Sequence, residues 1–206
     1  MNTRARSLLS IAAVTGAIFI KIFPFSGHLI GVALVLFLTR LQSPGGIKVW
    51  FRRTRISRLL FCGLIATLLT LAIDYFVLSF PGLPPVDFSR FHLLHNDARL
   101  TAVWIAAVWL FIAPSEELIS RAFMIDQWQA VFEGKPWASI AAVVLSSIGF
   151  GLAHFYEGPG GIVSNAGVGL CFGALYLIQR RSLWSNIFAH GVVDTLAMVA
   201  FFLGRL

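Results

Sequence analysis

The chain alternates between long apolar stretches and short polar segments, and this pattern predicts seven helices. The apolar stretches cover residues 8–23, 28–41, 59–80, 99–132, 137–155, 162–178 and 183–203. A helix that crosses a membrane needs about 20 apolar residues, so the five later stretches suit a crossing and the first two are short. The sequence therefore predicts an all-α, polytopic membrane helix bundle with about six to seven transmembrane helices.

The composition indicates that lipid covers much of the surface of this bundle. Hydrophobic residues make up 58% of the 206 positions, and charged residues make up 12%, about half the usual share of a soluble domain. Such a chain cannot cover its apolar residues with a polar shell. We expect a multi-pass protein of the cell membrane, with two cysteines that form no disulfide.

The basic residues predict the orientation of the helices. The formal net charge is +7, and six basic residues fall in one segment: Arg40, Lys48, Arg52, Arg53, Arg55 and Arg58. Loops rich in Lys and Arg stay in the cytoplasm, which predicts a cytoplasmic N-terminus and an external C-terminus. The turn at 180–181 falls on the cytoplasmic side, and the loops 81–97 and 156–161 fall opposite. No soluble segment carries a basic face with interleaved aromatic residues, so no nucleic-acid partner is expected.

Ionisable residues within the apolar stretches indicate a polar site inside the membrane. These residues are Glu116, Glu117 and Arg121 in the fourth stretch, His154 in the fifth, and His190 and Asp194 in the last. Each ionised side chain in a bilayer costs about 2.5–3.5 kcal/mol on insertion scales. A site that uses these groups is the default interpretation.

Spacing predicts that several of these groups meet. Glu116 lies nineteen residues before Lys135, and His154 lies nineteen residues after it. An antiparallel hairpin that turns at 134–136 would place both at the same depth. Glu117 and Arg121 are four residues apart, which predicts an ion pair and leaves Glu116 free to face the cavity.

Two further pairs and a set of glycines support this arrangement. Phe150 and His154 share one helix face, as do His190 and Asp194. Pro114 is expected to loosen the helix just before the glutamates. Small residues would let the helices pack closely around the site: Gly149, Gly151, Gly167, Gly169 and Gly173.

Together, these motifs resemble the CPBP family of CAAX proteases and bacteriocin-processing enzymes, which are intramembrane glutamic endopeptidases. The family pattern is Glu-Glu-x-x-x-Arg, then Phe-x-x-x-His, then His-x-x-x-Asn or Asp, and it corresponds here to residues 116–121, 150–154 and 190–194. The resemblance implies a catalytic helical core over 99–206, preceded by N-terminal transmembrane helices over 1–98. Prenyl-protein endopeptidases typically have Asn at the last position, where this chain has Asp194, so the protease class is better supported than a CAAX substrate.

The resemblance also implies roles for the residues. Glu116, with His154, would activate a water for attack on a peptide bond, and His190, with Asp194, would stabilise the oxyanion. Glu117, Arg121 and Phe150 would support this site. The expected substrate is a peptide or membrane protein in the lipid bilayer, without a cofactor or metal.

Other interpretations remain open. Either histidine could be a packing residue, and Glu117–Arg121 could be an ordinary ion pair at a helix end. A zinc peptidase could use Glu116, His154 and His190 as ligands. A non-catalytic immunity or scaffold protein, or a proton-coupled transporter, could hold the same groups.

Four further ionisable residues are expected outside the site. We expect Asp74 near the outer membrane interface, beside Tyr75, with a place in a second polar site as the alternative. His28, His92 and His95 are expected in loops or at the interface.

Overall fold

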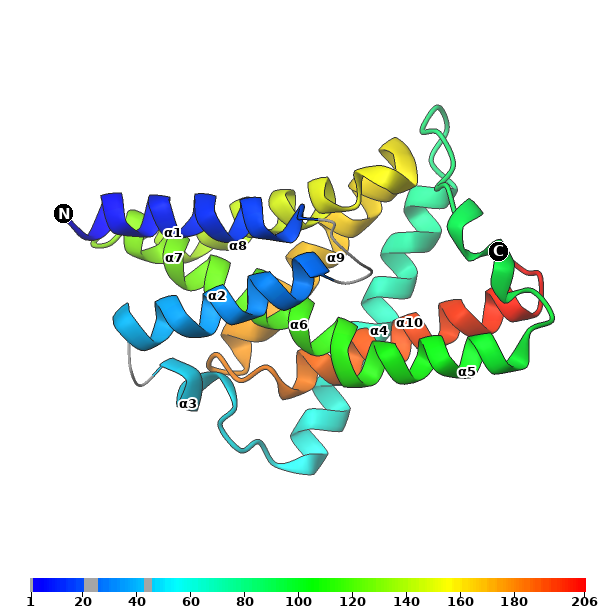
Figure 1. The fold of residues 1–206 in the computed structure, drawn as a ribbon, viewed down its shortest axis with the longest axis horizontal. Coiled ribbons are helices and arrows are strands. Elements are labelled where there is room, and N and C mark those ends of the chain that lie inside the picture. The colour runs from blue at the N-terminus through cyan, green and yellow to red at the C-terminus, as the bar shows by residue number, and fades with distance from the viewer. Residues whose placement is uncertain (1, 21–25, 43–45) are drawn as a thin grey trace.

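A computed structural model describes residues 2–20, 26–42 and 46–206, and its regular elements are all helices in this part of the chain. Its α-helices are α1 (Thr3–Ile18), α2 (Ser26–Gln42), α3 (Gly46–Trp50), α4 (Ile56–Leu78), α5 (Ala98–Ala107), α6 (Ala113–Glu117), α7 (Met124–Val131), α8 (Ala138–Ala153), α9 (Gly158–Ile178) and α10 (Trp184–Phe202). The predicted fold class is confirmed. The N- and C-termini lie at opposite ends of the long axis (Figure 1).

The predicted helix 99–132 is one run of helical turns that contains two wider segments. The π-helices η2 (Val108–Ile112) and η3 (Leu118–Phe123) lie on either side of α6. Pro114 in the first turn of α6 lacks an N–H and leaves a carbonyl one turn earlier without its usual partner, which favours a wider turn before it. Residues 116 and 117 therefore lie between two irregular turns.

The helices after residue 131 match the prediction, except at one turn. The turn before α8 contains Gly134, whose φ is +79°, as the hairpin prediction required. The expected external loop at 156–161 is wrong, because the 3₁₀-helix η4 (Phe155–Glu157) leads directly into α9. The chain reverses at Gly158, with a φ of +74°, and Pro159 then occupies the first turn of α9. The loop 81–97 holds the 3₁₀-helix η1 (Ser89–Leu94).

The N-terminal hairpin lies along the core rather than apart from it. The α1 helix begins at Thr3, because the Asn2 side chain accepts a hydrogen bond from the Ala5 N–H at 2.9 Å and caps the first turn. Figure 1 shows α1 beside α7, and both α1 and α6 lie next to α2. The sequence predicts the turn of this hairpin at 24–27; residues 24 and 25 lie outside the described residues, and Ser26 and Gly27 belong to the first turn of α2.

Four helices of the described chain are long and apolar enough to cross a membrane. They cover Ile56–Val77, Ala98–Val131, Phe155–Ile178 and Trp184–Phe202, and two shorter apolar helices cover Ser26–Gln42 and Ala138–Ala153. The two basic segments lie at the same end of the bundle, as predicted, since the Arg52 Nη2 donates to the Arg180 carbonyl at 3.0 Å.

Glycine allows the close approach of α8 and α9, which contribute two sides of the site. A Cβ on Gly151 would lie 2.5 Å from the Ile162 carbonyl oxygen, and Cβ atoms on Gly169 and Gly173 would meet side chains of α8. Gly167 instead faces Ile73 of α4. The predicted role of Gly149 is wrong, because a Cβ there would meet nothing within 4 Å.

We predict that Gly151→Ala destabilises the protein and that Gly149→Ala does not. The first substitution forces α8 and α9 apart, and overpacking of this kind costs about 1–3 kcal/mol. The second places a methyl group in open space and gains up to about 1 kcal/mol of helix propensity. Thermal unfolding of both purified variants in detergent measures the difference. Equal melting temperatures would contradict the packing argument.

Candidate intramembrane active site

The three motifs, which are far apart along the chain, form one cluster in space that is centred on a buried ion pair. The Arg121 Nε lies 3.3 Å from the Glu117 Oε2, and both side chains are at most 1% exposed. This confirms the ion pair predicted from the spacing. A pair so deeply buried is costly unless other groups satisfy both charges.

Aromatic rings from two other helices enclose the Arg121 guanidinium. Its Cζ lies 4.1 Å from the ring centroid of Phe150 on α8 and 5.6 Å from that of Phe172 on α9. The negative faces of these rings attract the cation where water is absent. The Phe150 side chain therefore supports the ion pair, which gives this motif position a physical role.

Glu117 also bonds to α10, so its role extends beyond the ion pair. Its Oε1 accepts a hydrogen bond from the His190 Nδ1 at 2.8 Å. Its Oε2 lies 3.3 Å from the Asn186 Nδ2, which also donates to the Phe172 carbonyl at 2.8 Å. One carboxylate thus joins the long helix to α10.

His190 lies between three carboxylates. Because Glu117 takes the Nδ1 side, the Nε2 side faces Asp194 at 3.5 Å and Glu116 at 3.8 Å. The contact between His190 and Asp194 was predicted from their spacing. The shorter bond to Glu117 shows that Glu117 has the stronger hold on the ring orientation.

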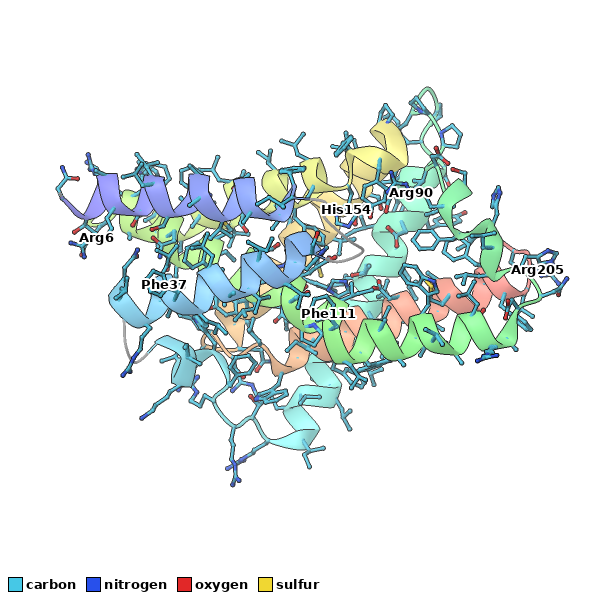
Figure 2. The ribbon with its side chains drawn as sticks, in the orientation of Figure 1. Arg6, Phe37, Arg90, Phe111, His154 and Arg205 are labelled. Carbon is cyan, nitrogen blue, oxygen red and sulfur yellow. The ribbon has the colours of Figure 1, made fainter. Side chains whose placement is uncertain are left out.

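Glu116 is less buried than Glu117, with 16% of its side chain exposed against 0%. Its Oε1 lies 3.2 Å from the Nε2 of His28, on the first turn of α2. The expectation that His28 lies in a loop or at the interface is wrong, since this histidine belongs to the cluster. Figure 2 labels Phe111, whose ring centroid lies 6.3 Å from that of His28.

His154 ends α8 and is held in one tautomer by its own helix. Its Nδ1 lies 2.9 Å from the Phe150 carbonyl oxygen, which can only accept a hydrogen bond. The Nδ1 therefore carries the proton, and the neutral ring keeps a lone pair on Nε2. His154 interacts electrostatically with Glu116, although the described residues show no direct hydrogen bond between them. Figure 2 shows His154 near the middle of the molecule.

A second set of polar side chains lies next to His154, on the side that faces α9. The ring of Tyr156 lies 5.7 Å from that of His154, and the Arg90 guanidinium lies 4.3 Å from the same tyrosine ring. Glu157 is buried and accepts from the Asn165 Nδ2 at 2.8 Å. These residues form one edge of the site between the loop 81–97 and α9.

Asp74 also differs from its expected position. It accepts a hydrogen bond from the Ser164 hydroxyl of α9, so it is not a lone carboxylate but faces a neighbouring helix. It also interacts electrostatically with Asp194. The polar cluster therefore extends towards α4.

Sequence reasoning missed two contacts for different reasons. Asn186 lies four residues before His190, so the same helical period that paired His190 with Asp194 could have found it. His28 and Glu116 are 88 residues apart on separate helices, and no local pattern links them. As for metals, no group of three or more His, Cys, Asp and Glu side chains in the described segments is arranged to hold an ion.

The fold and this cluster define a helical membrane protein with a buried site of carboxylates and histidines. Residues 98–196 match the family model described as Type II CAAX prenyl endopeptidase Rce1-like. The match spans all three motifs and confirms the resemblance to the CAAX proteases. The family indicates a protease, that is, a hydrolase. Searches of curated proteins and of solved structures gave no match.

We predict that Arg121→Ala and Glu117→Ala each lower the free energy of unfolding by about 3–5 kcal/mol, because either change leaves a buried charge without its partner. Arg181→Ala is the matched control: this arginine pairs with Asp126 at 2.8 Å, but its side chain is 41% exposed. Exposed pairs contribute about 0–1 kcal/mol. Chemical unfolding in detergent measures all three. A loss in Arg181→Ala as large as that in Arg121→Ala would contradict the burial argument.

Proposed function

We propose that this protein is a metal-free intramembrane endopeptidase of the cell membrane, in which Glu116 and His154 activate a water molecule. The observation that carries this proposal is the fixed tautomer of His154, whose Nδ1 bond to the Phe150 carbonyl leaves Nε2 as a base. The carboxylate of Glu116, from a different helix, interacts with this ring electrostatically. Both groups could accept a proton from one water.

The reaction would proceed in two steps. In the first, the water oxygen bonds to the carbonyl carbon of the peptide, and the water proton moves to the Glu116–His154 pair. In the second, the C–N bond breaks and the same pair returns the proton to the leaving amine. The products are a free carboxyl group and a free amine, as hydrolysis requires.

His190 would stabilise the oxyanion that forms in between. Its Nδ1 donates to Glu117, so the ring has a second N–H on Nε2 only when it is protonated, and this N–H would point towards Glu116 and Asp194, where the reacting carbonyl would lie. A donor held in place before the reaction can lower the barrier by several kcal/mol, about 2.7–4 for one oxyanion-hole donor. Glu117, Arg121 and Phe150 hold this histidine and do not react.

The proposed substrate is a peptide segment within the bilayer, of the CAAX type to which the family points. The first experiment compares membrane peptides from cells that express the wild type or Glu116→Gln. A peptide that ends in a new C-terminus only in wild-type cells identifies the cleavage site. Identical profiles, with both proteins present at equal levels, would contradict protease activity on the membrane proteins of those cells.

We predict that Glu116→Gln folds but loses about 10²–10⁴-fold in turnover, the usual contribution of a positioned base. His154→Ala should lose a similar factor, and the double variant should be little worse, because residues that act as a unit are not additive. Glu133→Gln, an exposed glutamate beyond α7, is the control and should retain full turnover. The assay follows cleavage of the identified peptide, prenylated and unprenylated, by purified protein.

Two outcomes would contradict this mechanism. Full activity in Glu116→Gln would exclude Glu116 as the base. Stoichiometric zinc in the purified wild type that is lost from Glu116→Gln, together with inactivation by chelators, would favour a zinc peptidase.

We predict that His28 positions Glu116. His28→Ala should lower kcat by about 10- to 100-fold, since hydrogen bonds to charged groups contribute about 1.5–3 kcal/mol, while KM changes little. His28→Gln keeps a donor and should recover part of the turnover. His92→Ala, an exposed histidine of η1, is the control. An equal effect of His28→Ala and His92→Ala would contradict this role.

A further inference from the structure

A basic cavity of about 800 Å³ lies far along α4 from the polar cluster, at the beginning of that helix. Its lining includes five arginines: Arg52, Arg53, Arg55, Arg58 and Arg180. The described residues that line it include no acidic side chain. The beginning of α4 lies at the lower edge of the molecule in Figure 1.

Two of these arginines are fixed by the end of α9. The Arg52 Nη2 donates to the Arg180 carbonyl at 3.0 Å, and the Arg58 Nη2 donates to the Ile178 carbonyl at 3.1 Å. The side chains of Arg53 and Arg55 have no hydrogen-bond or ion-pair partner among the described residues. Hydrogen bonds thus hold Arg52 and Arg58 in place at the cavity, whereas Arg53 and Arg55 are available to bind a ligand.

The N-terminus of α4 adds its own positive electrostatic potential to that of the arginines. Arg55 occupies the N-cap position of α4, and its side chain makes no capping hydrogen bond. The first N–H groups of this 23-residue helix therefore lack that partner and favour an anion nearby. Phosphate groups suit both such a helix end and guanidinium side chains.

The apolar side of the cavity indicates a lipid as the source of that phosphate. Phe61 lines the cavity and is 67% exposed. Leu64 and Leu68 continue the same face of α4, with exposed fractions of 50% and 67%. This helix is a candidate membrane span, and a crossing along it would place the cavity at headgroup level and the apolar face along the acyl chains.

We propose that this arginine cavity binds the phosphate of an anionic phospholipid whose acyl chains lie against Phe61, Leu64 and Leu68. The site is separate from the proposed catalytic residues. Its ligand would anchor the cytoplasmic end of α4 and the α9–α10 turn to the inner leaflet.

The test is native mass spectrometry of the full, purified and delipidated chain in detergent. Dioleoyl phosphatidylglycerol and dioleoyl phosphatidylcholine are titrated separately, and inorganic phosphate serves as a soluble competitor. The variant Arg53→Gln with Arg55→Gln removes the two unpaired cations. Arg4→Gln with Arg6→Gln removes the same charge from exposed positions on α1 and is the matched control.

We expect the wild type and the control to bind phosphatidylglycerol more tightly than phosphatidylcholine. The Arg53–Arg55 variant should bind phosphatidylglycerol about 20- to 30-fold more weakly, since each basic residue near an anionic surface contributes about fivefold. Equal binding of the two lipids by the wild type would overturn the proposal, and this readout needs no variant. An equal loss in both variants would overturn it as well. Displacement of the lipid by an equal concentration of inorganic phosphate would overturn the assignment to a lipid.

Discussion

The buried ion pair between Glu117 and Arg121 is the interaction on which the rest of the structure depends. Its charges are withdrawn from water, so they need partners from elsewhere in the fold. Phe150 supplies a ring from α8 and Phe172 one from α9, while His190 supplies an N–H from α10. The pair therefore contacts three other helices at once, and aromatic rings rather than hydrogen bonds surround the guanidinium, whose nitrogens have no hydrogen-bond partner among the described residues.

This arrangement separates the functions of two adjacent glutamates. Glu117 is fully enclosed and uses both oxygens to hold other groups, so it has no access to a substrate. Glu116 lies beside the histidines, with 16% of its side chain exposed. The π-helical turns before and after them change the direction in which each side chain points, since each turn departs from the regular α-helical period. Glu116 and Glu117 themselves lie in the regular segment α6, where the helical period alone points adjacent side chains in different directions.

The sequence was sufficient wherever the interaction was local. Hydropathy predicted most of the helices within a few residues, although α1 begins five residues before its predicted start and the short helix α3 was not predicted. Helical spacing predicted the Glu117–Arg121 and His190–Asp194 contacts. The sequence did not predict the position of residues that depends on tertiary contacts. The pairing of His28 with Glu116, and that of Asp74 with Ser164, join helices that are distant in the chain. The turn at Gly158 was read as a loop because its sharpness depends on backbone angles rather than on hydropathy.

The charge of Asp194 bears on the substrate more directly than the fold does. An asparagine at this position would be neutral, whereas an aspartate adds a carboxylate 3.5 Å from the His190 Nε2. An ionised carboxylate can only accept hydrogen bonds, so Asp194 competes with an oxyanion for the same N–H. Glu116 lies 3.8 Å from the same nitrogen, so two carboxylates face the position proposed for the oxyanion. The proposed stabilisation by His190 therefore requires the substrate carbonyl to replace Asp194 at this N–H.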